Sequence, residues 1–320
     1  MNNALLNVRL ARKQPEATDI CSFELVAEDG RALPAFTAGA HIDVHLPGGL
    51  IRQYSLCNAP DETHRYLIAV LRDPASRGGS TGMHALVEGQ SLQISAPRNH
   101  FPLATAARRH LLIAGGIGIT PLLCMAEALQ LQGADFGLHY CARSSTRMAF
   151  VERLSASPFA ARVRLHPDDA GPAQALPLAE LLDTTSHDTH LYVCGPTGFM
   201  DWVLNSAAQA GWPQERLHRE YFAGAAVDTS ADGRFEVQIA STGAVIPVAP
   251  QQSVVAALAA CGIEIPVSCE QGVCGTCITR VLAGQPDHRD MYFTPEEQAA
   301  NDQFTPCCSR SLSARLVLDL

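Results

Sequence analysis

Four cysteines in the last quarter of the chain have the spacing of ligands to an iron–sulfur cluster. Cys269, Cys274 and Cys277 form the pattern C-x4-C-x2-C, and Cys307 follows after 29 intervening residues. This is the plant-type spacing for a [2Fe–2S] cluster, in which four thiolates hold two irons. Glycines between the first three cysteines let backbone amides approach the sulfides and tune the potential. A structural zinc site usually takes two C-x2–4-C pairs, so the spacing favours the cluster.

The remaining cysteines form no comparable pattern. Cys308 is adjacent to Cys307, and the spacing favours Cys307 as the ligand and Cys308 as a buried neighbour. The chain has eleven cysteines, and no secretory signal is recognised at its N-terminus. We therefore expect metal binding or redox chemistry rather than a disulfide framework.

A glycine-rich turn follows an apolar run in the middle of the chain. The expected strand at 110–114 leads into Gly115, Gly116 and a third glycine, followed by Thr120 and Pro121. Glycines let a ligand approach the backbone, and Pro121 suits the first position of a helix that Thr120 would cap. A helix N-terminus that faces a crevice favours a pyrophosphate. The turn is not G-x-G-x-x-G, and alone it is equally compatible with tight packing.

A second turn strengthens the prediction of a nucleotide site. Cys194, Gly195 and Pro196 end a later strand, expected at 191–194. Ligands of open α/β sheets bind at the carboxyl ends of the strands, which is where both turns are expected. Taken alone, Cys194 is as compatible with a small packing residue as with a ligand contact.

Two segments in the first third of the chain are suited to a phosphorylated aromatic ring. Residues 52–55 (RQYS) lie on an expected strand, where Arg52 offers a planar cation to a phosphate. Tyr54 can lie against a ring, and Ser55 can hydrogen-bond its edge. Residues 77–81 (RGGST) form a polar glycine turn whose amides suit a phosphate. Each segment alone is also compatible with an ordinary exposed strand or turn.

The elements that position these residues fall into three regions. Residues 4 to about 104 are predicted as short strands separated by Gly and Pro turns, typical of an antiparallel barrel or sandwich. From about 108 to 222 strands alternate with helices, which indicates a doubly wound parallel sheet. Residues 223–233 are small and polar and are predicted as a linker. Expected strands are 40–46, 51–57, 66–71, 91–95, 110–114, 136–141, 163–166, 191–194, 235–240, 244–248 and 315–318; expected helices are 121–131, 178–182, 198–210 and 254–261.

Composition limits the classes of function. At about 150 residues per domain, 320 residues suggest two or three domains. Apolar residues are 47% and charged residues 17%, which excludes disorder of the whole chain. The net charge of −9 argues against nucleic-acid binding by bulk charge. No apolar run suits a membrane span, and no hydrolase or nucleotide-triphosphatase turn is present. We expect a cytoplasmic protein.

Taken together and in this order, these segments resemble the phthalate dioxygenase reductase family. That family is the branch of the ferredoxin–NADP reductase superfamily that contains flavin, NAD and plant-type ferredoxin domains. The resemblance covers essentially the whole chain and includes its last five residues (LVLDL). It implies a multidomain fold with an antiparallel β-barrel that binds FMN (1–106), an α/β doubly wound NAD(P) domain (107–222), the linker (223–233) and an α+β β-grasp ferredoxin domain (234–320).

The resemblance also implies roles at the flavin. Arg52 and Ser80 would hold its phosphate, Tyr54 and Ser55 would contact the isoalloxazine, and Phe222 would place an aromatic ring near it. Members of this length use FMN, and no inserted loop after residue 84 offers a platform for the adenine of FAD. FMN is therefore favoured.

At the pyridine nucleotide, the resemblance implies that Thr120 and Cys194 flank the nicotinamide. Residues 141–147 contain no acid that would favour the ribose of NAD, whereas Arg143 would accept a 2′-phosphate, so NADH is expected with NADPH left open. Asp168 and Asp169 follow an expected strand and could be loop residues or a ribose contact; the loop is favoured. The candidate catalytic residues are Ser55 and Cys194; the expected cofactor contacts are Arg52, Tyr54, Ser55, Gly79, Ser80, Thr81, Gly115, Gly116, Thr120, Arg143, Cys194, Gly195, Pro196 and Phe222.

The resulting functional prediction is an electron-transfer reductase. NAD(P)H reduces FMN, and single electrons then pass through the [2Fe–2S] cluster to a partner, by resemblance a Rieske-type oxygenase of aromatic compounds. The same chain serving an O-demethylase or a sulfonate monooxygenase is the alternative within this class. An iron–sulfur redox sensor is the alternative from another class. We expect a monomer.

Overall fold

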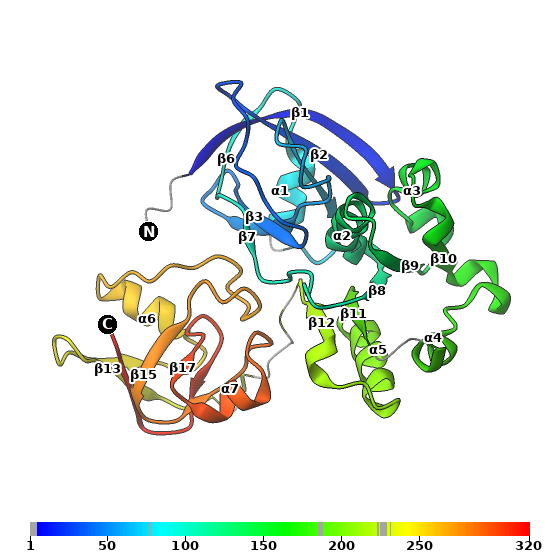
Figure 1. Cartoon of the computed structure of the whole chain (residues 1–320). Coiled ribbons are helices and arrows are strands. Elements are labelled where there is room, and N and C mark those ends of the chain that lie inside the picture. The colour runs from blue at the N-terminus through cyan, green and yellow to red at the C-terminus, as the bar shows by residue number, and fades with distance from the viewer. Residues whose placement is uncertain (1–4, 77, 185–187, 223, 225–228, 231) are drawn as a thin grey trace. The chain divides into compact units, whose positions relative to one another are not determined.

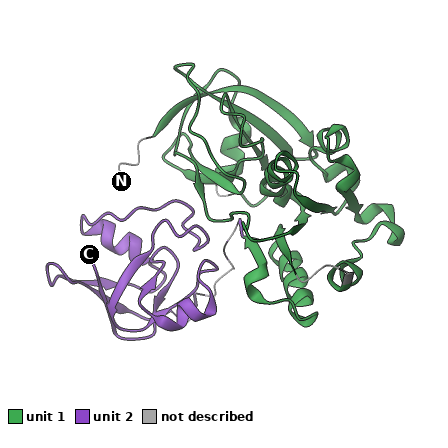
Figure 2. Ribbon diagram, viewed as in Figure 1, with its two compact units in different colours: residues 1–220 green, residues 221–320 purple. Residues whose placement is uncertain are grey.

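The computed structural model describes residues 5–76, 78–184, 188–222, 224, 229–230 and 232–320. The chain divides into two compact units, residues 1–220 (unit 1) and residues 221–320 (unit 2), shown in different colours in Figure 2. The expected limits of the three domains stay a prediction. Several residues of the expected linker, 223, 225–228 and 231, lie outside the described part.

An antiparallel sheet forms the first part of unit 1. Its strands are β1 (Leu6–Ala17), β2 (Ile20–Ala27), β3 (Ala40–His45), β4 (Ile51–Ser55), β5 (Tyr66–Leu71), β6 (Ser91–Ile94) and β7 (Arg98–Asn99). They lie in the order β4-β3-β6-β1-β2-β5, with β7 paired to β3. The short helix α1 (Gly79–Ala85) packs against β5. The sheet agrees with the antiparallel fold expected for the flavin domain (Figure 1).

A parallel sheet forms the second part of unit 1, as predicted. Its strands are β8 (Arg109–Gly115), β9 (Asp135–Ala142), β10 (Val163–Pro167), β11 (Thr189–Cys194) and β12 (Leu217–Glu220), in the order β10-β9-β8-β11-β12. The strand order reverses between β8 and β11, which is where open α/β sheets bind ligands. The helices are α2 (Ile119–Leu131), α3 (Val151–Ala156), α4 (Leu178–Thr184) and α5 (Thr197–Gln209). Short 3-10 turns occupy Gly116–Gly118, Ser145–Arg147, Ala160–Arg162, Asp168–Ala170, Pro172–Gln174 and Gln214–Arg216.

One continuous apolar core holds the two sheets of unit 1 together. Buried side chains of this core come from the antiparallel sheet, such as Phe23 and Ile42, and from α2 and the parallel sheet, such as Leu123 and Tyr140. Because the two sheets share a core, the carboxyl ends of the parallel strands keep a fixed position relative to β4.

Unit 2 is a mixed sheet with its own core. Its strands are β13 (Phe235–Ile239), β14 (Val245–Val248), β15 (Thr279–Ala283), β16 (Pro286–Asp287), β17 (Gln303–Phe304), β18 (Arg310–Ser311) and β19 (Arg315–Leu318), with helices α6 (Val254–Ala260) and α7 (Pro295–Ala300). The main sheet has the order β14-β13-β19-β15-β17. Its core, with Val237 and Leu258 fully buried, contains no residue of unit 1. The unit can therefore fold around its own interior.

Two local predictions were wrong. Thr120 does not cap α2, because the helix begins at Ile119 and the Thr120 hydroxyl donates to the carbonyl of Ile117 at 3.1 Å. Residues 79–81 are not part of an open turn, because α1 begins at Gly79, and residue 77 lies outside the described part of the chain. Gly78 precedes it with φ 94°, a left-handed conformation that glycine adopts without strain. In both segments the helix starts earlier than the polar residues suggested.

Candidate functional site

A buried polar cluster forms where β4 of the antiparallel sheet meets the ends of β11 and β12. Ser55 is the last residue of β4, Cys194 of β11 and Glu220 of β12. The Ser55 hydroxyl donates to Glu220 Oε2 at 3.2 Å, and Cys194 is the register partner of Glu220. His41, the register partner of Ser55, places Nδ1 3.9 Å from Glu220 Oε1. The two expected catalytic residues therefore lie around one carboxyl group.

Glu220 is the functional candidate that the sequence did not reveal. Its side chain is 15% exposed, and burial raises its pKa to about 8, against the lowering effect of the Ser55 hydrogen bond. Burial also raises the pKa of Cys194, and the Glu220 charge adds to this effect, so Cys194 is a neutral thiol. The cluster can therefore hold and release one proton near neutral pH, and the group that does so is Glu220.

The two segments expected to bind the flavin phosphate lie against each other. A Cβ atom added to Gly79 would lie 2.8 Å from Arg52 Cγ and Nε, so the start of α1 packs on the arginine stem. Ser80 Oγ accepts from the backbone of Asp73 at 3.1 Å, and Thr81 N donates to a neighbouring hydroxyl at 3.4 Å. The Arg52 stem therefore lies at the start of α1, while its Nη1 donates to the carbonyl of Ile51 at 2.7 Å.

Tyr54 and Thr120 lie deeper than free ligand contacts would. Burial raises the pKa of Tyr54, so its phenol is neutral, and the side chain packs against the apolar core. Thr120 is 2% exposed. Their roles as contacts of the isoalloxazine and the nicotinamide stay predictions.

The two turns expected to bind the pyridine nucleotide are in backbone contact. A Cβ atom on Gly118 would overlap the carbonyl of Cys194, and one on Gly195 would lie 2.9 Å from the Gly115 Cα. A Cβ atom on Gly115 would lie 3.1 Å from Pro196 Cδ, whereas one on Gly116, which has φ 55°, would meet nothing within 4 Å. The structure therefore brings the turns together at the switch point of the sheet, and the position of Gly116 is open.

An acidic side chain from the segment after β10 is hydrogen-bonded to the loop after β9. Asp169 follows β10, and its carboxylate accepts from Ser145 N at 3.0 Å and from Ser145 Oγ at 3.1 Å. Arg143 is exposed in the same loop, and Arg147 lies 3.6 Å from Asp19. Asp169 was predicted as a loop residue; the structure shows that it is bound to the loop that carries Arg143.

The cysteine loop of unit 2 brings the four expected ligands together. The thiols of Cys269 and Cys274 are in hydrogen-bond contact, as are those of Cys277 and Cys307. Hydrogen bonds from Cys274 and Cys307 lower the pKa of Cys269, which favours its thiolate. The amide of Gln271 donates to Cys269 Sγ at 3.3 Å, as expected for a ligand sulfur.

The fit of this loop to a [2Fe–2S] cluster is close. Gly275 has φ 68°, and a Cβ atom there would lie 2.5 Å from the ring of Tyr292, so the loop needs glycine to fold tightly. A [2Fe–2S] cluster takes two thiolates at each iron and therefore needs paired cysteines.

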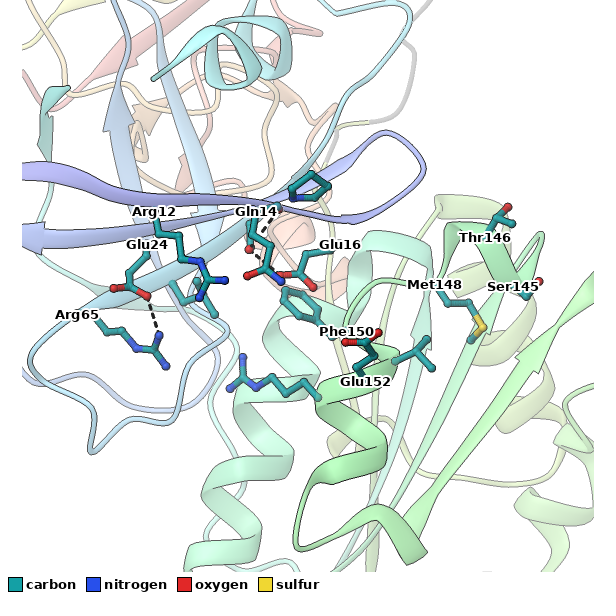
Figure 3. A pocket seen from close by; sticks show the side chains of 15 residues that line it. Arg12, Gln14, Glu16, Glu24, Arg65, Ser145, Thr146, Met148, Phe150 and Glu152 are labelled. Carbon is teal, nitrogen blue, oxygen red and sulfur yellow. Dashed lines mark hydrogen bonds and ion pairs between the residues drawn. The ribbon is translucent and has the colours of Figure 1, made fainter. Parts of the chain in front are cut away.

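Phe222, the aromatic residue expected near the flavin, is 42% exposed. A cavity of about 760 Å³ lies between the β1–β2 hairpin and the segment around α3, and none of the expected cofactor residues lines it. Figure 3 shows its charged side chains, among them Arg12, Arg65 and Glu152. Because both signs of charge are interspersed there, the cavity favours no single class of ligand.

Comparisons with known proteins agree with this geometry. Residues 237–312 match the family model described as a 2Fe-2S iron-sulfur cluster binding domain, which excludes the zinc alternative. Residues 94–217 match the model described as the N-terminal domain of dimethylamine monooxygenase subunit DmmA-like proteins. No helix in the described part of the chain is long and apolar enough to cross a membrane.

Relatives extend along the whole chain. The vanillate O-demethylase oxidoreductase of Pseudomonas putida is 59% identical over 99% of this chain and 100% of its own. The phthalate dioxygenase reductase of Burkholderia cepacia is 37% identical over 99% of this chain and 98% of its own. The solved structure of a phthalate dioxygenase reductase superposes with a TM-score of 0.77, at 37% identity, over 99% of this chain and 98% of that one. The chain belongs to the phthalate dioxygenase reductase family and is an oxidoreductase that passes electrons from NAD(P)H through FMN and a [2Fe–2S] cluster to a terminal oxygenase.

Proposed function

We propose that the oxygenase served by this reductase is a Rieske-type O-demethylase of a methoxylated aromatic acid. The observation that carries the proposal is the identity of 59% to a vanillate O-demethylase oxidoreductase over the full length of both chains. The lower identity of 37% to a phthalate dioxygenase reductase favours the demethylase over a ring-dihydroxylating oxygenase. We also propose that the protein acts as a monomer in the cytoplasm.

The test pairs the purified reductase with two terminal oxygenases. With NADH, it should support loss of vanillate by the oxygenase component of a vanillate O-demethylase at least about tenfold faster than oxidation of phthalate by a phthalate oxygenase, a preference of about 1.4 kcal/mol. Cytochrome c reduction, measured in parallel, shows that the reductase is intact. Equal support of both oxygenases would contradict the assignment.

We propose that Arg52, Ser80 and the amides at the start of α1 hold the phosphate of FMN, and that the Ser55–Glu220 pair lies at its reactive edge. When bound, FMN converts the two-electron donor into a source of single electrons. The protein binds the phosphate through charge-assisted hydrogen bonds. Its buried carboxyl group holds a proton that Ser55 can relay.

Glu220→Gln tests the proton-holding role. It should slow bleaching of the flavin by NADH roughly a hundredfold, because an amide cannot exchange the proton. In the native protein this step should decline above pH 8 as Glu220 ionises, and in the variant the decline should disappear. Stopped-flow absorbance between pH 6 and 9 measures both effects.

The same variant has a predicted effect on stability. A carboxyl group whose folded pKa is raised from 4.5 to about 8 costs stability progressively as pH rises between those values. The cost is on the order of 1.4 kcal/mol per pKa unit. Glu220→Gln should therefore flatten the dependence of urea unfolding on pH. The exposed Glu215, changed to Gln, is the control and should alter neither profile; a similar effect there would contradict the role of Glu220.

We further propose that Asp169 makes this site favour NADH. Its carboxylate is bound to the loop that carries Arg143, where it would repel the 2′-phosphate of NADPH. Asp169→Asn keeps one oxygen that can accept from Ser145 and removes the charge. It should raise kcat/KM for NADPH about fivefold relative to NADH, since two like charges about 4 Å apart in water repel each other by about 1 kcal/mol.

Matched variants separate this effect from general loop damage. Asp168→Asn removes a neighbouring exposed charge and should leave the preference unchanged. Arg143→Ala, added to Asp169→Asn, should reverse the gain with NADPH if Arg143 is the cation that meets the phosphate. An unchanged preference in Asp169→Asn would show that selection occurs elsewhere.

A further inference from the structure

Asp290 is a buried acid of unit 2 that belongs to none of the sites described above. Its side chain is 0% exposed, and it lies between β16 and α7. Asp290 Oδ2 accepts from the backbone amides of Tyr292 at 3.2 Å and Phe293 at 2.9 Å. His288 Nδ1 lies 3.5 Å from the other carboxylate oxygen. A buried carboxylate is costly unless donors face it, and the two amides are such donors.

The backbone of the same turn is fixed on the cysteine loop. The amide of Met291 donates to the carbonyl of Gly272 at 3.0 Å. Gly272 lies between the predicted ligands Cys269 and Cys274 and has φ 71°. A Cβ atom there would lie 3.0 Å from Asp290 Cα, so the two backbones are in close contact. Asp290 is therefore held against the loop that carries the first three predicted ligands.

The second carboxylate oxygen faces the segment that carries the fourth predicted ligand. Ser309 is 0% exposed, and its Oγ donates to Asp290 Oδ1 in a long hydrogen bond of 3.4 Å. The same hydroxyl accepts from the amide of Arg289, the residue before Asp290, at 3.1 Å. Ser309 comes directly after Cys307 and Cys308. Asp290 and its neighbour therefore contact both segments of the predicted ligand set.

A short series of polar side chains continues from Ser309 toward Cys308. Thr305 Oγ1 is 3.0 Å from Ser309 Oγ and 3.3 Å from Cys308 Sγ. An ionised carboxyl group accepts hydrogen bonds and cannot donate them. With the Ser309 hydrogen directed to Asp290, the Thr305 hydroxyl donates to Ser309. The carboxylate thus orients the hydroxyl groups beside the fourth predicted ligand, as outer partners of metal ligands do.

We propose that Asp290 is a positioning residue for the [2Fe–2S] cluster, because it joins the loop at Gly272 to the segment at Ser309. The cluster needs thiolates from both segments, and 29 residues separate Cys277 from Cys307. The negative charge of Asp290 also lies beside these segments, where it disfavours the added electron. The proposal rests on the 2Fe-2S domain and concerns what holds its two ligand segments in place.

Two substitutions remove this contact in different ways. Asp290→Asn keeps one oxygen for the turn amides but places an amide group opposite Ser309, whereas Ser309→Ala removes the hydroxyl and keeps the charge. In the full-length protein, each should speed the release of iron to an excess of chelator about fivefold, the effect of one lost buried hydrogen bond. The exposed Asp302 and Ser241, changed to Asn and Ala, are the controls and should release iron at the native rate. Flavin bleaching by NADH should be native in all four variants.

The double variant tests whether the two residues share one contact. Asp290→Asn combined with Ser309→Ala should release iron no faster than the faster single variant, because the contact can be lost only once. A rate equal to the product of the two single effects, about twenty-fivefold, would show that the residues act separately and would overturn the proposal. Native iron release in both single variants would overturn it as well.

The cluster potential separates a position beside the cluster from a general effect on folding. Asp290→Asn should raise the ratio of reduced to oxidised cluster at a given applied potential about tenfold, which is about 59 mV for a one-electron couple. Ser309→Ala keeps the charge and should shift the ratio less. These expectations hold whichever of Cys307 and Cys308 is the ligand, because Ser309 follows both, so an error in the ligand assignment is distinguishable from a failure of the contact. An unchanged potential in Asp290→Asn would overturn the place of Asp290 at the cluster.

Discussion

Replacement of Cys274 by Ser should stop electron delivery to the oxygenase while NADH still bleaches the flavin. Cys274 is 4% exposed and lies in the segment that matches the 2Fe-2S cluster binding domain, where we predict that it is a ligand. Loss of one of the four predicted thiolates would leave the cluster short of a ligand. Ferricyanide reduction should remain near the native rate, whereas cytochrome c reduction and oxygenase-coupled turnover should fall to background.

The damage should stay in unit 2, because that unit has its own core and the expected flavin contacts other than Phe222 lie in unit 1. Cys261→Ser is the matched control: Cys261 is an exposed cysteine of the same unit, directly after α6, and its replacement should leave iron content and turnover unchanged. Native oxygenase-coupled turnover in Cys274→Ser would show that the cluster is not on the electron path. Loss of flavin bleaching as well would show that the two units are not independent.

Local sequence patterns predicted many of the elements and the 2Fe-2S domain, because both depend on short-range spacing. The strand 66–71 and the strand 315–318 have the predicted limits. The four cysteines lie within the residues that match the 2Fe-2S domain model, and their role as ligands stays a prediction. The glycine turns at 115–118 and 194–196 were predicted from their place at strand ends. Their contact follows from the parallel order of β8 and β11.

Contacts between distant segments could not be predicted in this way. Glu220 lies 165 residues from Ser55, and nothing local distinguishes it from any other acid at the end of a strand. Asp169 reaches Ser145 only because β10 and β9 are neighbours. His139 and His166 on the same two strands are hydrogen-bonded at 2.9 Å, although their spacing in the sequence showed no pattern. In each case the chemistry depends on which strands pair.

Gly118→Ala should reduce both the stability of unit 1 and the rate of flavin reduction by NADH. The added Cβ atom would overlap the Cys194 carbonyl and lie 2.6 Å from the amide nitrogen of Gly195. These are backbone atoms at the end of β11, so no side chain can rotate away. Unfolding in urea should show a loss of about 3 kcal/mol, near the upper end for an overpacked site. Flavin bleaching by NADH should slow about a hundredfold, since a misplacement of about 1 Å has that effect on a positioned reaction.

Gly198→Ala provides the control for the loss of glycine itself. Gly198 lies in the first turn of α5, and a Cβ atom there meets nothing within 4 Å. Alanine there should change stability by less than about 1 kcal/mol and leave the bleaching rate as it is. If Gly118→Ala lost stability but bleached its flavin at the native rate, the contact between the turns would serve only folding. If Gly118→Ala bleached its flavin more slowly but kept the native free energy of unfolding, the contact between the turns would position the nicotinamide directly. In that case the substitution would have changed the site and not the core.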